Sequence, residues 1–149
     1  IIDYTYSRKH TFFESDLEEV THIDFTHPFD SQLRALILRS INSVNTSQET
    51  PRVVMDGGVY GCTQGPRLET AAEIGRLKRD GCDMVGMTGM PEAALARELG
   101  IAYAGISLSV NWAAGLSDDP ITLPEIHQVL NTGMSFINAL LDQLIRDYS

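Results

Sequence analysis

The stretch that decides the fold begins with GGVYGCTQGPRLET at residues 57–70, continues with GMTGMPE at residues 86–92, and ends at Asn111. Within it, Glu69, Thr88 and Asn111 each follow a strand-like or turn-like segment. Because open α/β sheets bind small molecules at the carboxyl ends of their strands, folding can bring these three polar side chains to one rim of a sheet. The stretch therefore predicts both an α/β sheet and a small-molecule site at the rim of that sheet.

Apolar runs around this stretch predict the strands. Short strands are expected at residues 53–55, 59–60 and 83–87, with a turn or bulge at residues 56–58. The run at residues 101–110 is longer and carries interleaved small residues, a pattern typical of a strand buried on both faces. These strands alternate with helices, which favours parallel pairing and an α/β fold.

The helices are predicted by the spacing of apolar residues and by capping signals. A first amphipathic helix follows Asp30 and is expected to cover one face of the sheet. Three more are expected: one from the capping box of Thr70 and Glu73 to the stop at Gly81, one between Pro91 and Gly100, and one from the capping box of Thr122 and Glu125 to the end of the chain.

Composition limits the class of protein. The 149 residues suit one domain, and the net charge of -9 argues against a general surface for nucleic acid or anionic membrane. Cys62 and Cys82 lack a metal-ligand spacing and fit a reducing compartment, so we expect a cytoplasmic protein without a metal site. The sequence contains no apolar run long enough to span a bilayer.

Residues 1–29 mix aromatic, His and acidic residues without a helical or strand period, which predicts an ordered loop. The first residues, 1–4, look as if cut out of a buried strand, so we expect the chain to begin in mid-domain. Phe12 and Phe13 are open to two interpretations: they plug the core of their own chain, or they pack against a partner subunit.

Two sequence blocks carry a resemblance to a known family. GPRLET at residues 65–70, MTGMPE at residues 87–92 and the run ending in Asn111 resemble the trimeric purine nucleoside phosphorylases and the methylthioadenosine phosphorylases. The resemblance continues through the final helix and implies a homotrimer with a mixed sheet flanked by helices. It makes residues 1–149 the C-terminal part of a single nucleoside phosphorylase domain. The family's N-terminal half carries a glycine-rich phosphate loop and an Arg-His pair that this sequence lacks, so we expect the chain alone to be inactive.

The resemblance implies a pentosyl transfer in purine salvage, in which phosphate attacks the anomeric carbon of a purine nucleoside while the base leaves. It requires no cofactor, since inorganic phosphate is a co-substrate. Asn111 is the implied catalytic donor to the base, Glu69 accepts from N1–H of a 6-oxopurine, and Thr88 contacts phosphate. The remaining implied positions are the substrate-binding residues Met87, Ala113, Ile126, Tyr60 and Leu68, and Phe12 and Phe13 in the pocket of a neighbouring subunit.

The resemblance also suggests the substrate. In the methylthioadenosine enzymes the positions of Glu69, Asn111 and Ala113 carry a hydroxyl and two aspartates, so this chain looks like a reader of 6-oxopurines. Ile126 falls where general purine nucleoside enzymes have a His for the 5′-hydroxyl, and an apolar residue there favours a methylthio group. A shift of one position would bring His127 there instead. The expected reaction converts S-methyl-5′-thioinosine to hypoxanthine and 5-methylthioribose 1-phosphate.

Other interpretations stay open. Glu69 could merely cap a helix, Asn111 and Thr88 could form turns, and Met87 and Tyr60 could fill the core. At the level of function, the alternatives are a general inosine and guanosine phosphorylase, a methylthioadenosine phosphorylase, or an inactive fragment that binds a purine.

Overall fold

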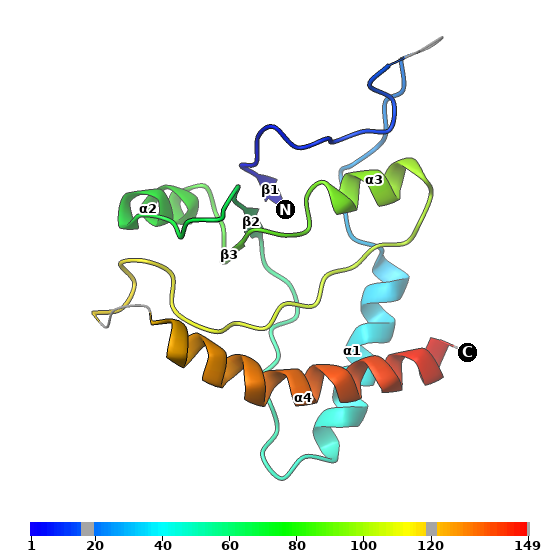
Figure 1. Cartoon of the computed structure of the whole chain (residues 1–149). Coiled ribbons are helices and arrows are strands. Elements are labelled where there is room, and N and C mark those ends of the chain that lie inside the picture. Colours follow the sequence, from blue (N-terminus) through cyan, green and yellow to red (C-terminus); the bar gives the residue numbers. More distant parts are fainter. Residues whose placement is uncertain (16–19, 119–121, 149) are drawn as a thin grey trace. The chain divides into compact units, whose positions relative to one another are not determined.

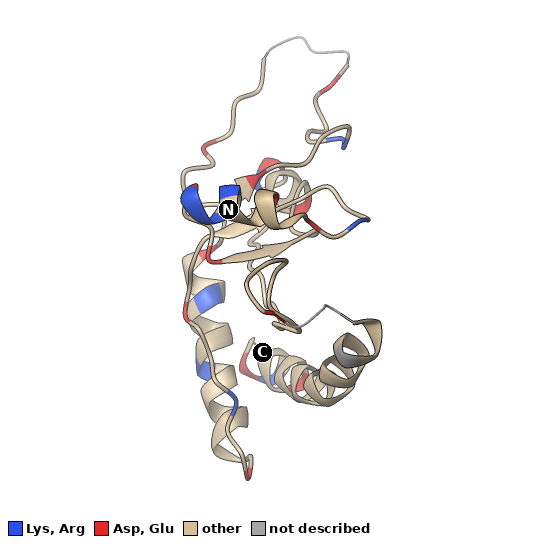
Figure 2. Ribbon diagram, turned by 90° about the vertical axis from the view of Figure 1, so that its left-hand side faces the viewer, with Lys and Arg blue, Asp and Glu red and all other residues tan. Residues whose placement is uncertain are grey.

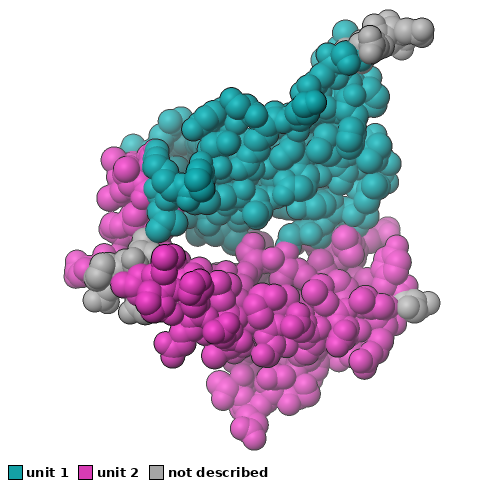
Figure 3. All heavy atoms as spheres, viewed as in Figure 1, with its two compact units in different colours: residues 1–30, 58–68, 75–105 teal, residues 31–57, 69–74, 106–149 magenta. Residues whose placement is uncertain are grey.

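The computed structural model describes residues 1–15, 20–118 and 122–148, and it has the α/β class that the sequence predicts (Figure 1). The chain forms two compact units, coloured in Figure 3, and each is described here by itself. The first unit comprises residues 1–30, 58–68 and 75–105, and the second comprises residues 31–57, 69–74 and 106–149.

The first unit is built on a parallel sheet of β1 (Ile2–Asp3), β2 (Tyr60–Cys62) and β3 (Met84–Gly86), in that spatial order. Ile2 lies opposite Gly61, and Gly61 lies opposite Val85. The pairing continues past the strand ends, where Thr63 N donates to Gly86 O at 2.8 Å. The predictions of parallel pairing and of a strand at the first residues are therefore confirmed.

A small apolar core lies beside this sheet. Its buried members come from β2, from the start of α3 (Glu92–Glu98) and from Met90 just before that helix, and partly buried side chains pack against them. The core consists of Cys62, Met90, Ala93 and Ala94 with Ile1, Phe25, Tyr60 and Tyr103 around them. Small residues at Ala93 and Ala94 let α3 approach the sheet closely, which fixes the connection that leads from β3 into this helix.

Local signals set the ends of α2 (Ala71–Arg79) as the sequence predicts. Thr70 N donates to Glu73 Oε2 at 2.7 Å and Glu73 N donates to Thr70 Oγ1 at 3.2 Å, which is a complete capping box. Gly81 follows the helix with a φ of 90°, and Gly100 follows α3 with a φ of 65°, conformations that glycine adopts without a steric penalty.

The second unit pairs α1 (Ser31–Thr46) with α4 (Leu123–Tyr148), which are the first and last helices predicted from the sequence. The buried face of α1 holds Ile37, Ile41 and Val44 together with Ser40, whose hydroxyl donates to Asp147 Oδ2 at 2.5 Å. Among the described residues of this unit, the apolar face of α1 thus packs against the helix α4. The capping box proposed for α4 depends on the Glu125 side chain, which lies outside the described residues.

Two predicted strands are wrong. Residues 53–55 and 101–110 are extended but form no ladder with the described strands, and Val53 and Met55 are 92% and 79% exposed. A strand exists only when a neighbour supplies hydrogen-bond partners, and apolar content cannot provide that neighbour. Residues 51–57 are tied to α1 by side chains instead, through the ion pair of Arg34 Nη2 with Asp56 Oδ1 at 2.6 Å.

The N-terminal segment is irregular after β1, as expected for a loop. Phe12 is 57% exposed and Phe13 is 37% exposed, so the interpretation that they plug the core of their own unit is wrong. Phe12 N donates to Glu98 Oε2 at 2.8 Å, which anchors this loop to the end of α3. The part of the loop at residues 16–19 lies outside the described residues.

Candidate active site

Tyr60 and Thr88 form the centre of the candidate site in the first unit. Tyr60 pairs with Met84 at the start of β2, whereas Thr88 comes two residues after the carboxyl end of the neighbouring strand β3, so the Tyr60 ring reaches Thr88 by crossing over Gly86. Thr88 N donates to the Tyr60 hydroxyl at 3.3 Å, and the two hydroxyl oxygens are also 3.3 Å apart. Tyr60 is half-buried and Thr88 is exposed, so the Thr88 hydroxyl remains accessible to a ligand at this rim.

Two glycines make room for the side chains of the site. A Cβ on Gly86 would lie 2.1 Å from the Tyr60 hydroxyl oxygen, and one on Gly65 would lie 2.5 Å from Met87 Sδ. The Tyr60 ring therefore crosses directly over the backbone of β3, and Met87 lies against the connection that follows β2. The structure thus brings Tyr60, Met87 and Thr88 together around two positions without a side chain.

Cys62 supports Thr88 from the interior. Its thiol is fully buried and donates to Thr88 O at 3.2 Å. Burial raises the pKa of the Cys62 thiol, although a backbone hydrogen bond from Met90 and the charge of Arg8 oppose this shift. A buried thiol with a raised pKa is a poor nucleophile, so Cys62 serves packing and positioning.

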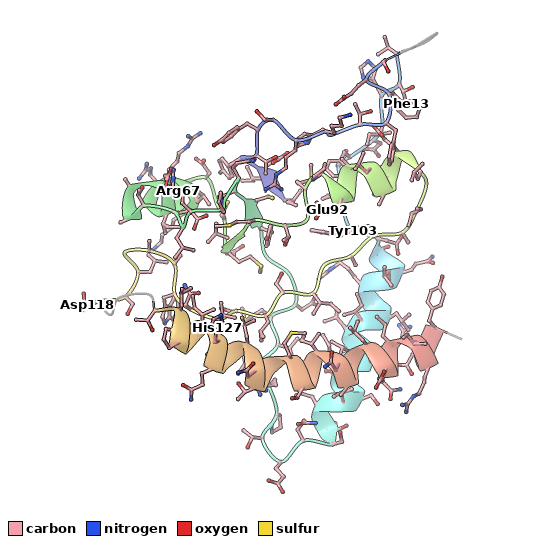
Figure 4. The ribbon with its side chains drawn as sticks, viewed as in Figure 1. Phe13, Arg67, Glu92, Tyr103, Asp118 and His127 are labelled. Carbon is pink, nitrogen blue, oxygen red and sulfur yellow. The ribbon has the colours of Figure 1, made fainter. Side chains whose placement is uncertain are left out.

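Tyr103 lies at the edge of the same core. Burial raises the pKa of its phenol, and the negative charge of Glu92 adds to the effect (Figure 4 labels both residues). Its ring stacks on Phe29 with 6.2 Å between the centroids. The sequence predicted a strand at Tyr103. In the structure Tyr103 lies in an irregular segment and packs against the apolar core.

The second unit holds the other group of predicted residues. Glu69 is half-buried just before α2, Asn111 is exposed and Ala113 is half-buried. The two segments touch: a Cβ on Gly115 would lie 2.6 Å from the Cβ of Ala71, so the loop that contains Asn111 packs against the start of α2. Asn111 Nδ2 donates to Trp112 O at 2.7 Å, an exposed hydrogen bond that a ligand can replace.

The first turn of α4 also belongs to this group. Ile126 is half-buried and its N donates to Thr122 O at 3.2 Å, whereas His127 is exposed on the same turn (Figure 4). Further along α4, a Cβ on Gly133 would lie 2.3 Å from Leu108 Cδ2, so the helix packs closely on the segment that leads to Asn111. Within this unit, Ile126 is therefore the more enclosed of the two candidates.

Two further candidates, Leu68 and Phe13, are surface residues of the first unit. Leu68 is 51% exposed and its carbonyl accepts from Arg67 Nη1 at 3.1 Å, which is a local structural contact for Arg67. Phe13 is on the N-terminal loop (Figure 4). Sequence reasoning missed one residue, Arg8, whose side chain reaches the loops beneath Thr88. An isolated arginine in an irregular loop carries no pattern that would have revealed this.

Among the described residues, Lys and Arg are distributed over several separate elements (Figure 2). Within the described ranges, no cluster of three His, Cys, Asp or Glu side chains is suited to hold a metal ion. Nor does any helix among the described residues have the length and apolarity needed to cross a membrane.

The model of the phosphorylase superfamily matches residues 1–146. The chain belongs to this family. As a phosphorylase superfamily member, it is 54% identical over 145 residues to a probable S-methyl-5′-thioinosine phosphorylase of Pseudomonas syringae pv. tomato, covering 97% of the chain and 56% of that protein. It is 42% identical over 144 residues to a probable 6-oxopurine nucleoside phosphorylase of Dictyoglomus turgidum, covering 97% of the chain and 52% of that protein.

Solved structures support the same assignment. A methylthioadenosine phosphorylase from Schistosoma mansoni in complex with adenine superposes with a TM-score of 0.86 at 25% identity, covering 97% of this phosphorylase superfamily chain and 56% of the other. A methylthioadenosine phosphorylase from an antarctic soil metagenomic library gives a TM-score of 0.83 at 27% identity, covering 97% and 49%. The chain spans about half the length of the curated relatives it matches.

Proposed function

We propose that residues 1–149 are the C-terminal part of a single nucleoside phosphorylase domain, and that the complete protein cleaves S-methyl-5′-thioinosine with phosphate. A phosphate oxygen bonds to C1′ of the methylthioribose while the bond from C1′ to N9 of the base breaks. The electron pair of that bond goes to the purine, which takes up a proton and leaves as hypoxanthine. The second product is 5-methylthioribose 1-phosphate.

The observation that carries this proposal is the relationship to proteins named probable S-methyl-5′-thioinosine phosphorylases, at 54% and 49% identity over almost the whole chain. The candidate residues agree with that substrate. A carboxylate at Glu69 suits N1–H of hypoxanthine, and an unprotonated carboxylate finds no donor at N1 of adenine. The geometry adds accessible polar groups in the form of the exposed Thr88 hydroxyl and the exposed Asn111 amide.

Each residue has one role in the proposed reaction. The Thr88 hydroxyl donates a hydrogen bond to phosphate. Tyr60 and the Cys62 thiol hold the Thr88 main chain through the hydrogen bonds described above. The Asn111 amide turns from Trp112 O to the base and donates to N7 as negative charge develops there. Preorganised donors of this kind lower the barrier because the charge that they stabilise is largest in the transition state.

The 5′ end of the sugar is assigned to Ile126. A half-buried aliphatic side chain accepts a methylthio group without loss, whereas a 5′-hydroxyl placed against it would lose its hydrogen bond to water. Met87 packs against the ribose, and Ala113 and Leu68 complete the base and sugar walls. We propose further that the protein is a cytoplasmic homotrimer in which the exposed Phe12 and Phe13 close the pocket of a neighbouring subunit.

The test is an assay of the complete protein with and without inorganic phosphate, using methylthioinosine, inosine and methylthioadenosine as substrates. We expect phosphate-dependent release of hypoxanthine, with methylthioinosine giving the highest kcat/KM. Absence of phosphate-dependent base release from all three substrates would overturn the proposal. Replacing Asn111 and Ala113 by Asp together should move the preference toward methylthioadenosine, and an unchanged preference would mean that other residues select the base.

A second candidate is a general 6-oxopurine nucleoside phosphorylase, which the 42% identity to the Dictyoglomus turgidum protein favours. The two candidates differ at the 5′ position only. If the site is built for methylthioinosine, Ile126→His should lower kcat/KM for methylthioinosine and raise it for inosine, while His127→Ile, on the exposed neighbouring position, should change neither. Faster cleavage of inosine by the unchanged protein would favour the general enzyme.

A further inference from the structure

Arg8 makes more side-chain contacts to the main chain than its place in an irregular loop suggests. It lies five residues after β1 and is half-buried. Its guanidinium donates to Met90 O through Nη1, and through Nη2 to Thr63 O at 3.3 Å, Gln64 O at 2.9 Å and Met87 O at 3.1 Å. One side chain therefore holds four main-chain carbonyl groups.

These carbonyl groups belong to two connections at the same edge of the sheet. Thr63 and Gln64 follow β2, whereas Met87 and Met90 follow β3. The same connections carry candidate site residues, since Thr88 is the next residue after Met87 and the first connection continues to Leu68 and Glu69. Arg8 thus joins two loops that carry candidate site residues.

The segment that carries Arg8 is itself fixed to the sheet. Tyr4 N donates to Cys62 O at 2.8 Å, which extends the pairing of β1 with β2. Tyr6 N donates to Gln64 Oε1 at 3.0 Å. The main chain just before Arg8 is thus held at Tyr4 and at Tyr6, which limits where the guanidinium can lie relative to both connections.

A guanidinium is the side chain suited to this task. It offers five N–H donors in a rigid plane, whereas a lysine ammonium offers three donors from one point and cannot reach both connections in the same geometry. The donors of Arg8 are directed at main-chain carbonyl groups, so its contribution to the site is the spacing of the two loops and not a direct charge on phosphate.

We propose that Arg8 is a positioning residue for the phosphorolysis proposed above, acting through Met87 and Thr88. The proposal rests on that function. Arg8 keeps the main chain of Met87 at a fixed distance from the connection after β2, and this sets where the Thr88 hydroxyl meets phosphate. A displacement of about 1 Å in such a group can cost about a hundredfold in rate, even when the altered residue does not touch the reacting atoms.

The experiment compares Arg8→Met and Arg8→Lys in the complete protein with Arg97→Met as the matched control. Arg97 is also half-buried and donates to a main-chain carbonyl, that of His27, but neither residue is a candidate site residue. We expect both Arg8 variants to lower kcat/KM by about a hundredfold. Arg97→Met should keep the activity of the unchanged protein. If Arg8→Met does not fold, Arg8→Lys carries the test.

A double-mutant cycle with Thr88→Val separates positioning from general support of the fold. If Arg8 acts through Thr88, then Arg8→Lys should cost much less in the Thr88→Val protein than in the unchanged protein. Losses that simply multiply, or near-normal kcat/KM for Arg8→Lys, would overturn the positioning role while leaving the proposed function intact. No turnover by the unchanged protein would overturn both.

Discussion

Replacing Gly86 by alanine tests the central geometric feature of the candidate site. The new Cβ would lie 2.1 Å from the Tyr60 hydroxyl oxygen and 2.8 Å from Cζ, whereas ordinary contacts begin at 3.4 Å. The hydroxyl must therefore move by about 1.3 Å, and the ring cannot simply rotate because its Cε2 is also close, at 3.2 Å. Overpacking of this kind typically costs about 1–3 kcal/mol of stability.

The displacement should also reach Thr88. The Tyr60 hydroxyl accepts from Thr88 N and lies 3.3 Å from Thr88 Oγ1, so moving it removes one contact on the Thr88 main chain and one on the hydroxyl that is proposed to bind phosphate. A shift of about 1 Å in a positioned group corresponds to about a hundredfold in rate. We therefore expect Gly86→Ala to lower kcat/KM by about that factor and to raise the KM for phosphate.

The assay is steady-state kinetics of the complete protein with varied phosphate, together with thermal unfolding. Gly75→Ala is the matched control, because its Cβ would meet only the end of Arg79 at 3.7 Å inside α2. This control should be as stable as the unchanged protein or more stable, by about 0.5–1 kcal/mol, with normal kinetics.

A second substitution separates strain from positioning. Tyr60→Phe in the Gly86→Ala protein removes the closest clashing atom, so stability should recover in part, while the contacts to Thr88 stay lost and activity stays low. Normal kcat/KM and normal phosphate KM in a folded Gly86→Ala protein would refute the reasoning. Tyr60 would then move aside without any effect on Thr88.

Three further predictions concern the base site, a helix end and the contact between α1 and α4. Asn111→Ala should lower kcat by about two to three orders of magnitude with little change in unfolding temperature, because its side chain is exposed and its proposed role is in the transition state; an unchanged kcat would remove it from the proposed mechanism. Thr70→Val should destabilise the protein by about 0.5–2 kcal/mol in denaturant unfolding through loss of the capping box, and an unchanged midpoint would contradict the role of that box. Hydrogen bonds from Ser40 and Gln143 lower the pKa of the Asp147 carboxyl below its usual value of 3.8. These hydrogen bonds therefore stabilise the folded protein fully above pH 3.8, and this stabilisation is lost as the pH falls through the lower pKa of the folded state. Urea unfolding should thus show Ser40→Ala to be destabilised at neutral pH, by an amount that shrinks below pH 3.8; equal destabilisation at all pH values would contradict this contribution.

Much of the helical structure could be predicted, because a helix is defined by neighbours in the sequence. Its hydrogen bonds join residues four apart, and its ends are set by side chains within one turn. The reciprocal bonds of Thr70 and Glu73 and the left-handed Gly81 could therefore be predicted from a few letters. The blocks at residues 65–70 and 87–92 pointed to the family in the same way, and the match over residues 1–146 confirmed it.

The candidate site was predicted only in its residue types. Glu69, Thr88 and Asn111 were singled out because they follow strand-like or turn-like segments, and their roles stay predictions. The contacts that hold Thr88 could not be predicted, since the Tyr60 hydroxyl and the Cys62 thiol reach it from another strand. No local pattern relates residues that are 26 and 28 positions apart.

The sequence by itself determined the helices, the capping box of α2, the glycine stops after α2 and α3, and the family. Tertiary structure decided which extended segments became strands, because a strand needs a partner elsewhere in the chain to satisfy its backbone groups. Residues 2–3 found that partner in β2, whereas residues 53–55 and 101–110 form no ladder with any strand that the structure describes. Tertiary structure also decided the role of Arg8, because its acceptors come from two loops more than fifty residues away in sequence and only folding brings them within reach of one guanidinium.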